Sequence, residues 1–393
     1  MDEPRATFGT IAGFYDLQNS TNRVIWPPNL ERGGESVISG IPDWTGLVVT
    51  TETGESYLPG VDASSIRKYH QSMSLRNGIV QTNITWAPTR SENALQVHFT
   101  VLAHQRDINL GLVRLDIIGR KDANVTITDI LDGAGATRSS FQSKGQELEN
   151  DLIWTIISPN GQPSVLAYEY STVRLHPQAQ VSKGACKNAL ENRFTALWIS
   201  PNISTATQSW CLALKAGVPS TVYKYVGIAS TDAFGDDAQL IARNSALTAK
   251  KAIWKDLILT HNQVWDDLWE NADITVPGDR EIQKTTRASL FHLLSNLRPG
   301  GEGPGLGDNS LSPSGLSSDS YGGYIFWDAD TWVAPSLLAL HPDRAMSINN
   351  YRSKLHRQAQ ANIKENEFRE FAGALYPWTS GRFGNCTGNG ETN

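Results

Sequence analysis

The chain of 393 residues is long enough for two domains, each with a core of its own. Its hydrophobic fraction of 39% and charged fraction of 19% are those of an ordinary folded protein. A net charge of -6 predicts no basic face, which excludes nucleic acid as a partner. No apolar run approaches the ~18 residues of a membrane span. Residues 1–5 lack the apolar segment of a signal peptide, which indicates either a cytoplasmic protein or a natural N-terminus further upstream.

Cysteine is scarce, since only Cys186, Cys211 and Cys386 are present. An odd number leaves at least one thiol unpaired within the chain. Cys186 and Cys211 could form a disulfide, and two buried thiols are an equal alternative. No Cys/His spacing indicates a metal site, and we expect no cofactor. Sequons, at about the number expected by chance, make five asparagines candidates for glycosylation: Asn19, Asn83, Asn124, Asn202 and Asn385.

Strand-like alternation of apolar and polar residues extends from Gly46 to about Ser230. Many alternating stretches with no helical stretch between them predict a large antiparallel sandwich. The clearest stretches are residues 95–101, 113–117, 125–128, 152–156, 166–170, 210–214 and 222–228.

The period changes near Asp232, where apolar residues begin to recur every three or four positions. This spacing predicts two helices over residues 236–269, with a kink between them. Asp279 is the expected N-cap of a further helix that ends before Pro299-Gly300. Two more helices are expected, one over residues 331–340 and one from Pro342 to about residue 363.

Residues 321–330 read Tyr-Gly-Gly-Tyr-Ile-Phe-Trp-Asp-Ala-Asp and end a long Gly/Pro/Ser loop that begins at Arg298. Loops of this length inside compact domains are usually functional or disordered. Aromatic rings stack on sugar faces and carboxylates bind hydroxyls, so we interpret the stretch as a sugar-binding subsite. The alternative is structural: a buried Trp327 beside a capping Asp328, a capping Asp330, and Trp378 in the core.

Several motifs together indicate a specific resemblance to one known family. They are Phe326-Trp327-Asp328-Ala329-Asp330, Leu340-His341-Pro342, Tyr351-Arg352 and residues 376–388, which begin Tyr-Pro-Trp-Thr-Ser-Gly-Arg, with residues 10–16, 33–42, 307–310 and 317–321 upstream. Over nearly its whole length the chain resembles glycoside hydrolase family 65, and most of all the fungal acid trehalase branch.

The resemblance implies a fold of strands followed by helices. It predicts an antiparallel β-super-sandwich over residues 1–231, incomplete at its start, and a helical linker over residues 232–272. Residues 273–393 would then hold the first helices of an incomplete (α/α)6 catalytic barrel. The uncovered edge of that barrel would expose apolar helix faces, which could meet the missing part of the barrel or a second copy of the chain.

The resemblance also implies an inverting hydrolase of α,α-trehalose or a related glucosyl disaccharide. Trp327 and Asp328 match the family's glucose-binding pair, and Trp378 matches a motif near the same site. Asp330 stands where the family usually has Glu, which leaves its role open.

The resemblance places no catalytic residue in this chain. Inversion needs a general acid and a general base. In the family the general acid is the Glu of an aromatic-Glu-aromatic-His motif, and Glu391 lacks these flanking residues. Both catalytic residues are therefore expected beyond Asn393. The chain is thus expected to be truncated at both ends, inactive alone, and part of a secreted, cell-wall or vacuolar protein. A disaccharide phosphorylase, another α-glucosidase of the family and a non-catalytic carbohydrate-binding protein remain alternatives.

Overall fold

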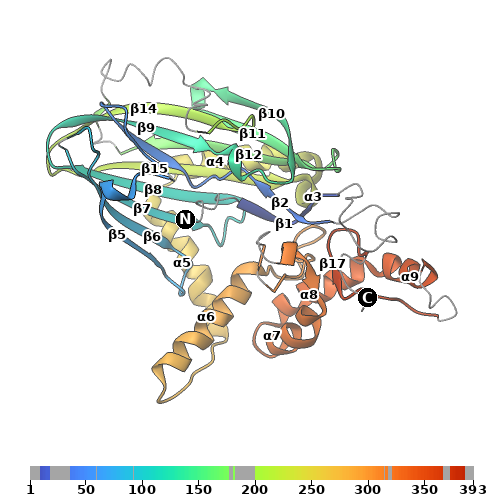
Figure 1. Ribbon diagram of the computed structural model, residues 1–393. Helices are drawn as coiled ribbons and strands as arrows, with labels where there is room; N and C mark the ends of the chain where they lie inside the picture. Colours follow the sequence, from blue (N-terminus) through green and yellow to red (C-terminus); the bar gives the residue numbers. More distant parts are fainter. Residues whose placement is uncertain are drawn as a thin grey trace.

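The computed structural model describes residues 9–17, 36–58, 60–91, 93–176, 180–181, 200–313, 315–316, 321–365 and 372–385. Strands occupy the chain as far as Ser230, and helices dominate from Thr231 onward. The strands form the upper part of the molecule in Figure 1, and the helices extend below and beside them.

Two antiparallel sheets form the sandwich. The larger has the order β10-β11-β12-β15-β8-β7-β6-β5, and the smaller has the order β13-β14-β9-β3-β4. The larger sheet consists of β5 (Ile66–Met73), β6 (Val80–Trp86), β7 (Leu95–Ala103), β8 (Leu110–Gly119), β10 (Ser139–Glu147), β11 (Leu152–Pro159), β12 (Ala167–Leu175) and β15 (Ser220–Ser230). The smaller consists of β3 (Leu47–Thr51), β4 (Ser56–Tyr57), β9 (Ala123–Leu131), β13 (Gln180–Val181) and β14 (Ala206–Leu214).

The core of the sandwich is formed by the inward-facing residues of both sheets. Val49 and Ile127 of the smaller sheet pack in one cluster with Val97 and Leu115 of the larger one, and all four are fully buried. The alternation along the sequence therefore predicted the fold class correctly, and the expected strands correspond to β7, β8, β9, β11, β12, β14 and β15.

A separate antiparallel pair, β1 (Gly9–Tyr15) and β2 (Ile38–Ile41), was not predicted, because the alternation was recognised only from Gly46 onward. Tyr15 ends β1 and is buried, and its hydroxyl donates to the carbonyl of Gly323 at 2.6 Å. Burial raises the pKa of this phenol well above its usual value. The Tyr15 hydroxyl stays neutral, and its hydrogen bond joins the β1–β2 pair to the loop that precedes α7 (Ala334–Leu340).

The expected kinked pair of helices is confirmed as α4 (Ala238–Lys251) and α5 (Trp254–Asn271), which follow the short α3 (Thr231–Phe234). Helix α4 lies on β12 and β15. It presents a stripe of small buried residues to the sheet, which are Ala238, Ala242, Ala246 and Ala249. A stripe without bulky side chains lets the helix backbone approach the strands closely.

Gly227 on β15 completes this close approach, and we expect Gly227→Ala to be destabilising. A Cβ atom there would lie 1.8 Å from the carbonyl oxygen of Ala242, so sheet and helix would have to separate. Overpacking of this kind typically costs about 1–3 kcal/mol. Urea unfolding should show the loss, and Gly301→Ala, whose Cβ would meet nothing within 4 Å, is the matched control. Equal stability of the two variants would show that α4 does not pack as described.

The remaining helices are α6 (Arg280–Asn296), α7 (Ala334–Leu340), α8 (Pro342–Lys354) and α9 (His356–Glu365). The expected N-cap is confirmed, because the Asp279 carboxylate accepts from the backbone N–H groups of Glu281 and Ile282. Pro342 occupies the first turn of α8, as expected. The long helix expected after Pro342 is wrong in its length, since it breaks at Leu355 and α9 starts at His356.

No helix in the described part of the chain is long and apolar enough to cross a membrane. Among the same residues, no group of three or more His, Cys, Asp or Glu side chains could hold a metal ion. Cys211 on β14 is disulfide-bonded, and the other two cysteines, Cys186 and Cys386, lie outside the described residues. So do Asn19 and Glu391.

Candidate sugar-binding site

A small antiparallel pair of strands builds the site from two segments that are far apart in the sequence. The strands are β16 (Ile325–Phe326) and β17 (Thr379–Ser380), and Phe326 is the register partner of Thr379. The pairing continues one residue further, because the backbone N–H of Trp327 donates to the carbonyl of Trp378 at 3.3 Å. The two tryptophans named by the sequence are thus brought side by side.

The rings of Trp327 and Trp378 lie edge to face, with centroids 5.3 Å apart and planes at 70°. Both residues are 42% exposed, so part of each indole ring is open to solvent. The Trp327 indole N–H donates to the carbonyl of Tyr376 at 3.2 Å, which fixes the ring. Phe326 also lies edge to face with Trp378, with ring centroids 6.1 Å apart. Exposed, oriented aromatic faces of this kind suit the apolar face of a sugar ring.

Asp328 follows Trp327 and is half-buried. Its carboxylate makes no hydrogen bond or ion pair with any residue of the described ranges. It occupies the N-cap position of the following turn without accepting a capping hydrogen bond. The capping interpretation of Asp328 is therefore wrong, and neither carboxylate oxygen has a partner within the described ranges.

The expectation that Asp330 is a helix cap is also wrong. A π-helical turn over Ala329–Val333 precedes α7, so the helical backbone begins before the expected start and Asp330 lies inside it. Its carboxylate is held by Arg352 of α8, with Nη2–Oδ2 at 2.6 Å and Nε at 3.1 Å from both oxygens. Arg352 also donates to the carbonyl of Phe326 at 3.3 Å. The ion pair thereby ties α8 to the turn that carries Trp327.

A cavity of about 380 Å³ opens beside these groups. Its described lining consists of Trp327, Asp330, Arg352, Ala374, Leu375 and Tyr376. Trp327 and Tyr376 give the cavity an aromatic wall, and Asp330 and Arg352 form an ion pair whose two charges cancel. This mixture of apolar and polar surface is typical of small-molecule sites.

Tyr351 of α8 holds the segment that follows Trp378 in place. It is buried, donates from its hydroxyl to the carbonyl of Gly381 at 2.6 Å, and lies 2.8 Å from the Ser380 hydroxyl. Burial raises the pKa of Tyr351 to about 12, so the phenol stays protonated and keeps its donor. The Tyr351-Arg352 motif was recognised in the sequence, but no role could be predicted for either residue. Their hydrogen-bond partners lie about 20–30 positions away in the chain, so no local pattern connects them.

Asp330 is the carboxylate among the described lining residues of this cavity, and Asp328 lies two residues before it in the chain without being one of them. An inverting hydrolase needs a general acid and a general base about 6.5–9.5 Å apart, with a water between one of them and the sugar. Asp330 is already paired with Arg352. The described residues of the site therefore supply no such acid–base pair.

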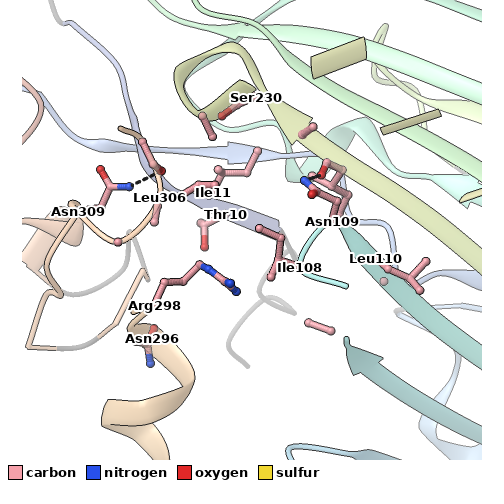
Figure 2. Close-up of a pocket in the computed structure, with 18 of the residues that line it drawn as sticks. Thr10, Ile11, Ile108, Asn109, Leu110, Ser230, Asn296, Arg298, Leu306 and Asn309 are labelled. Atoms are coloured by element: carbon pink, nitrogen blue, oxygen red, sulfur yellow. Dashed lines mark hydrogen bonds between the residues drawn. The ribbon is translucent and has the colours of Figure 1, made fainter. Parts of the chain in front are cut away.

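A second cavity, of about 300 Å³, lies between the sandwich and the helical part. Figure 2 shows Arg298 extending into it near Thr10 and Ile108, and the Arg298 guanidinium pairs with Glu302 at 2.6 Å. None of its described lining residues is a carboxylate, and apolar side chains such as Ile11 and Leu306 form much of the wall. Polar side chains such as Asn109, Asn296 and Asn309 also line it, but none of the three aromatic or acidic residues selected from the sequence, Trp327, Asp328 and Trp378, is among its described lining residues.

Comparisons with known proteins agree with the architecture. Residues 2–268 match the model of the glycosyl hydrolase family 65 N-terminal domain, and residues 287–393 match that of the family 65 central catalytic domain. In three dimensions, a protein named as a kojibiose phosphorylase from the human microbiome superposes with a TM-score of 0.76 at 17% identity. The match covers 97% of this chain and 47% of that protein, and it shows the fold.

Curated relatives include the cell wall acid trehalase of Candida albicans, 36% identical over 97% of this chain and 34% of the relative. The periplasmic/secreted acid trehalase of Candida glabrata is 35% identical over 97% of the chain and 31% of its own length. A kojibiose hydrolase of Mucilaginibacter mallensis is 27% identical over 81% of the chain and 44% of its own length. The chain thus spans about a third of the length of these fungal relatives, and it belongs to glycoside hydrolase family 65.

Proposed function

We propose that this chain provides the glucose-binding side of an active site that hydrolyses α,α-trehalose with inversion. The carrying observation is the exposed Trp327–Trp378 pair beside a carboxylate, Asp328, that has no partner in the described part of the chain. The fungal relatives named as acid trehalases support trehalose as the substrate. The chain spans about a third of the length of these relatives. Trehalose hydrolysis by a whole protein that includes this chain is therefore itself proposed here.

The geometry suggests a division of roles. The open face of Trp327 packs on the apolar face of the glucose ring, and Asp328 accepts hydrogen bonds from its hydroxyls. Trp378 limits the site on the other side. The Arg352–Asp330 pair holds the π-helical turn in place, and the general acid and base come from outside the described residues. On this proposal the 393-residue chain alone binds sugar and releases no glucose from trehalose.

A second substrate, kojibiose, is supported by the relatives named as kojibiose hydrolases at 27% and 26% identity. Both disaccharides place a glucose unit in the subsite formed by Trp327 and Asp328. They differ in the second sugar, so a comparison of their affinities addresses specificity without altering the assignment of the subsite.

For the architecture, we propose that residues 1–231 form the sandwich, residues 232–272 a linker, and residues 273–393 the first part of an (α/α)6 barrel. Large exposed apolar side chains on the helical part support an uncovered barrel edge, and they are Ile282, Trp332, Leu338 and Met346. Further barrel helices would cover this surface.

We also propose a secreted or cell-wall location, supported by fungal relatives that are named as secreted, periplasmic or cell-wall proteins. Asn83 of a sequon is exposed on β6, which is compatible with an attached glycan.

Asp328→Ala should weaken the binding of glucose and trehalose to the 393-residue chain about 10- to 100-fold, the loss expected for one or two hydrogen bonds to a charged acceptor. Isothermal titration calorimetry with glucose, trehalose and kojibiose measures this directly. Asp267→Ala, which removes an exposed carboxylate on α5, is the matched control and should bind like the unaltered chain. Equal affinity of the Asp328 and Asp267 variants would remove the assignment of the subsite.

A further inference from the structure

Arg382 connects the sugar site to the sandwich. Its guanidinium donates to both carboxylate oxygens of Asp232 on α3, at 2.7 and 2.5 Å, and to the carbonyl of Gly13 on β1 at 3.0 Å. Its backbone N–H donates to the Ser36 hydroxyl at 3.3 Å. Two segments of the strand-rich part, at Gly13 and Ser36, and helix α3 at Asp232 therefore hold Arg382.

The same residue lies at the end of the segment that carries Trp378. Gly381 accepts the hydroxyl hydrogen bond of Tyr351, and Ser380 is the register partner of Ile325 on β16. Only three residues separate Arg382 from Trp378. A shift of Arg382 is therefore transmitted to the Trp378 ring through a short, hydrogen-bonded strand.

The surroundings leave few substitutes for the Asp232–Arg382 pair. The neighbouring cation, Lys354, is engaged by Asp308 at 3.2 Å and by the Asn309 side chain at 2.8 Å. A cavity of about 290 Å³ lies directly against the pair, lined among others by Asp232, Lys354, Asp308 and Arg382. Because this space is not filled by packed side chains, the ion pair and its hydrogen bonds fix the segment, and packing alone does not.

We propose that Arg382 is a positioning residue of the sugar subsite, which acts through its pair with Asp232 to set the Trp378 ring against Trp327. The inference rests on the proposed function for its consequence in sugar binding, and on the geometry alone for its consequence in ring placement. It makes the strand-rich part and helix α3 functional parts of the site, because Gly13, Ser36 and Asp232 determine where Trp378 lies.

Circular dichroism and calorimetry on the 393-residue chain test the two consequences separately. Two indoles at 5.3 Å and 70° couple and give an exciton band pair, which is identified as the signal lost in Trp378→Phe. Arg382→Met should diminish this signal and weaken glucose binding about tenfold, because a displaced Trp378 ring no longer bounds the subsite. Arg382→Lys, which keeps the charge without the planar fork, should lie between the two.

Arg76→Met is the matched control, because Arg76 also joins the sandwich to a helix, through Asp266 on α5, at a place remote in sequence from the site. It should keep both the exciton signal and the affinity. The proposal is overturned if Arg382→Met lowers only the melting temperature and keeps signal and affinity. If Arg382→Met does not fold, Asp232→Asn and Arg382→Lys decide by the same two readouts. If the unaltered chain binds no sugar, the proposed function fails, and the exciton signal still decides the positioning role.

Discussion

Lys224→Met should lower the free energy of unfolding by about 3–5 kcal/mol, the loss typical of breaking a buried ion pair. Lys224 on β15 is fully buried between the sheets, and its ammonium group lies 2.9 Å from the Asp129 carboxylate. It also donates to the carbonyls of Gly46 and Ile130 at 2.9 and 2.7 Å. All three ammonium hydrogens thus have acceptors, and the substitution would leave Asp129 as a buried charge with no cation.

Urea unfolding followed by circular dichroism measures this loss. Lys215→Met is the matched control, because Lys215 forms an exposed ion pair with Asp122 that should contribute less than about 1 kcal/mol. If both lysine variants unfold at the same urea concentration, the central Lys224–Asp129 pair does not stabilise the sandwich.

The effect of Glu169→Gln on the free energy of unfolding should depend strongly on pH. Glu169 on β12 is fully buried, and neither carboxylate oxygen has a hydrogen-bond partner. Burial raises the pKa of Glu169 well above its usual value; Lys224 opposes the rise in pKa, and Asp43 adds to it. Since Lys224 already pairs with Asp129, ionisation of Glu169 would place a second negative charge beside a single ammonium group.

The direction follows from the linkage between proton binding and folding. A carboxyl whose pKa is raised on folding contributes stability below the unfolded pKa of about 4.3, and this contribution is lost as pH rises towards the folded pKa. Over that window the unaltered chain should lose about 1.4 kcal/mol per pH unit relative to Glu169→Gln, which cannot ionise. Unfolding at a series of pH values tests this, with the exposed Glu149→Gln as control. A difference between the Glu169 variant and the unaltered chain that stays constant with pH would mean that Glu169 is not held protonated.

The fold was predictable where strands bury one face. The strands β7, β8 and β15 alternate clearly, whereas β5, β6 and β10 of the same sheet were not recognised. Of these three, β5 and β10 are the edge strands of the larger sheet, and seven of the eight side chains of β5 are exposed. A strand that buries little has no reason to alternate, so its sequence carries no such signal. Lys224 shares a face of β15 with Val222 and Val226, but the alternation did not reveal that its ammonium group is buried beside Asp129.

The site was predictable in its residue types and not in its geometry. Trp327, Asp328 and Trp378 were selected by chemistry and by the resemblance to family 65. Their proximity depends on the β16–β17 pairing across about 50 residues, which leaves no periodic pattern in the sequence. Asp330 was misassigned because a π-helical turn starts the helix early, and Arg352, from the next helix, takes its carboxylate.

A crystal structure of the 393-residue chain with trehalose tests the central claim most directly. We expect one glucose ring to lie against the open face of Trp327, with its hydroxyls within hydrogen-bond distance of Asp328 and Trp378 beside it. Trehalose bound at another place, or absent from this site at concentrations that saturate the calorimetric titration, would contradict the assignment of the glucose subsite.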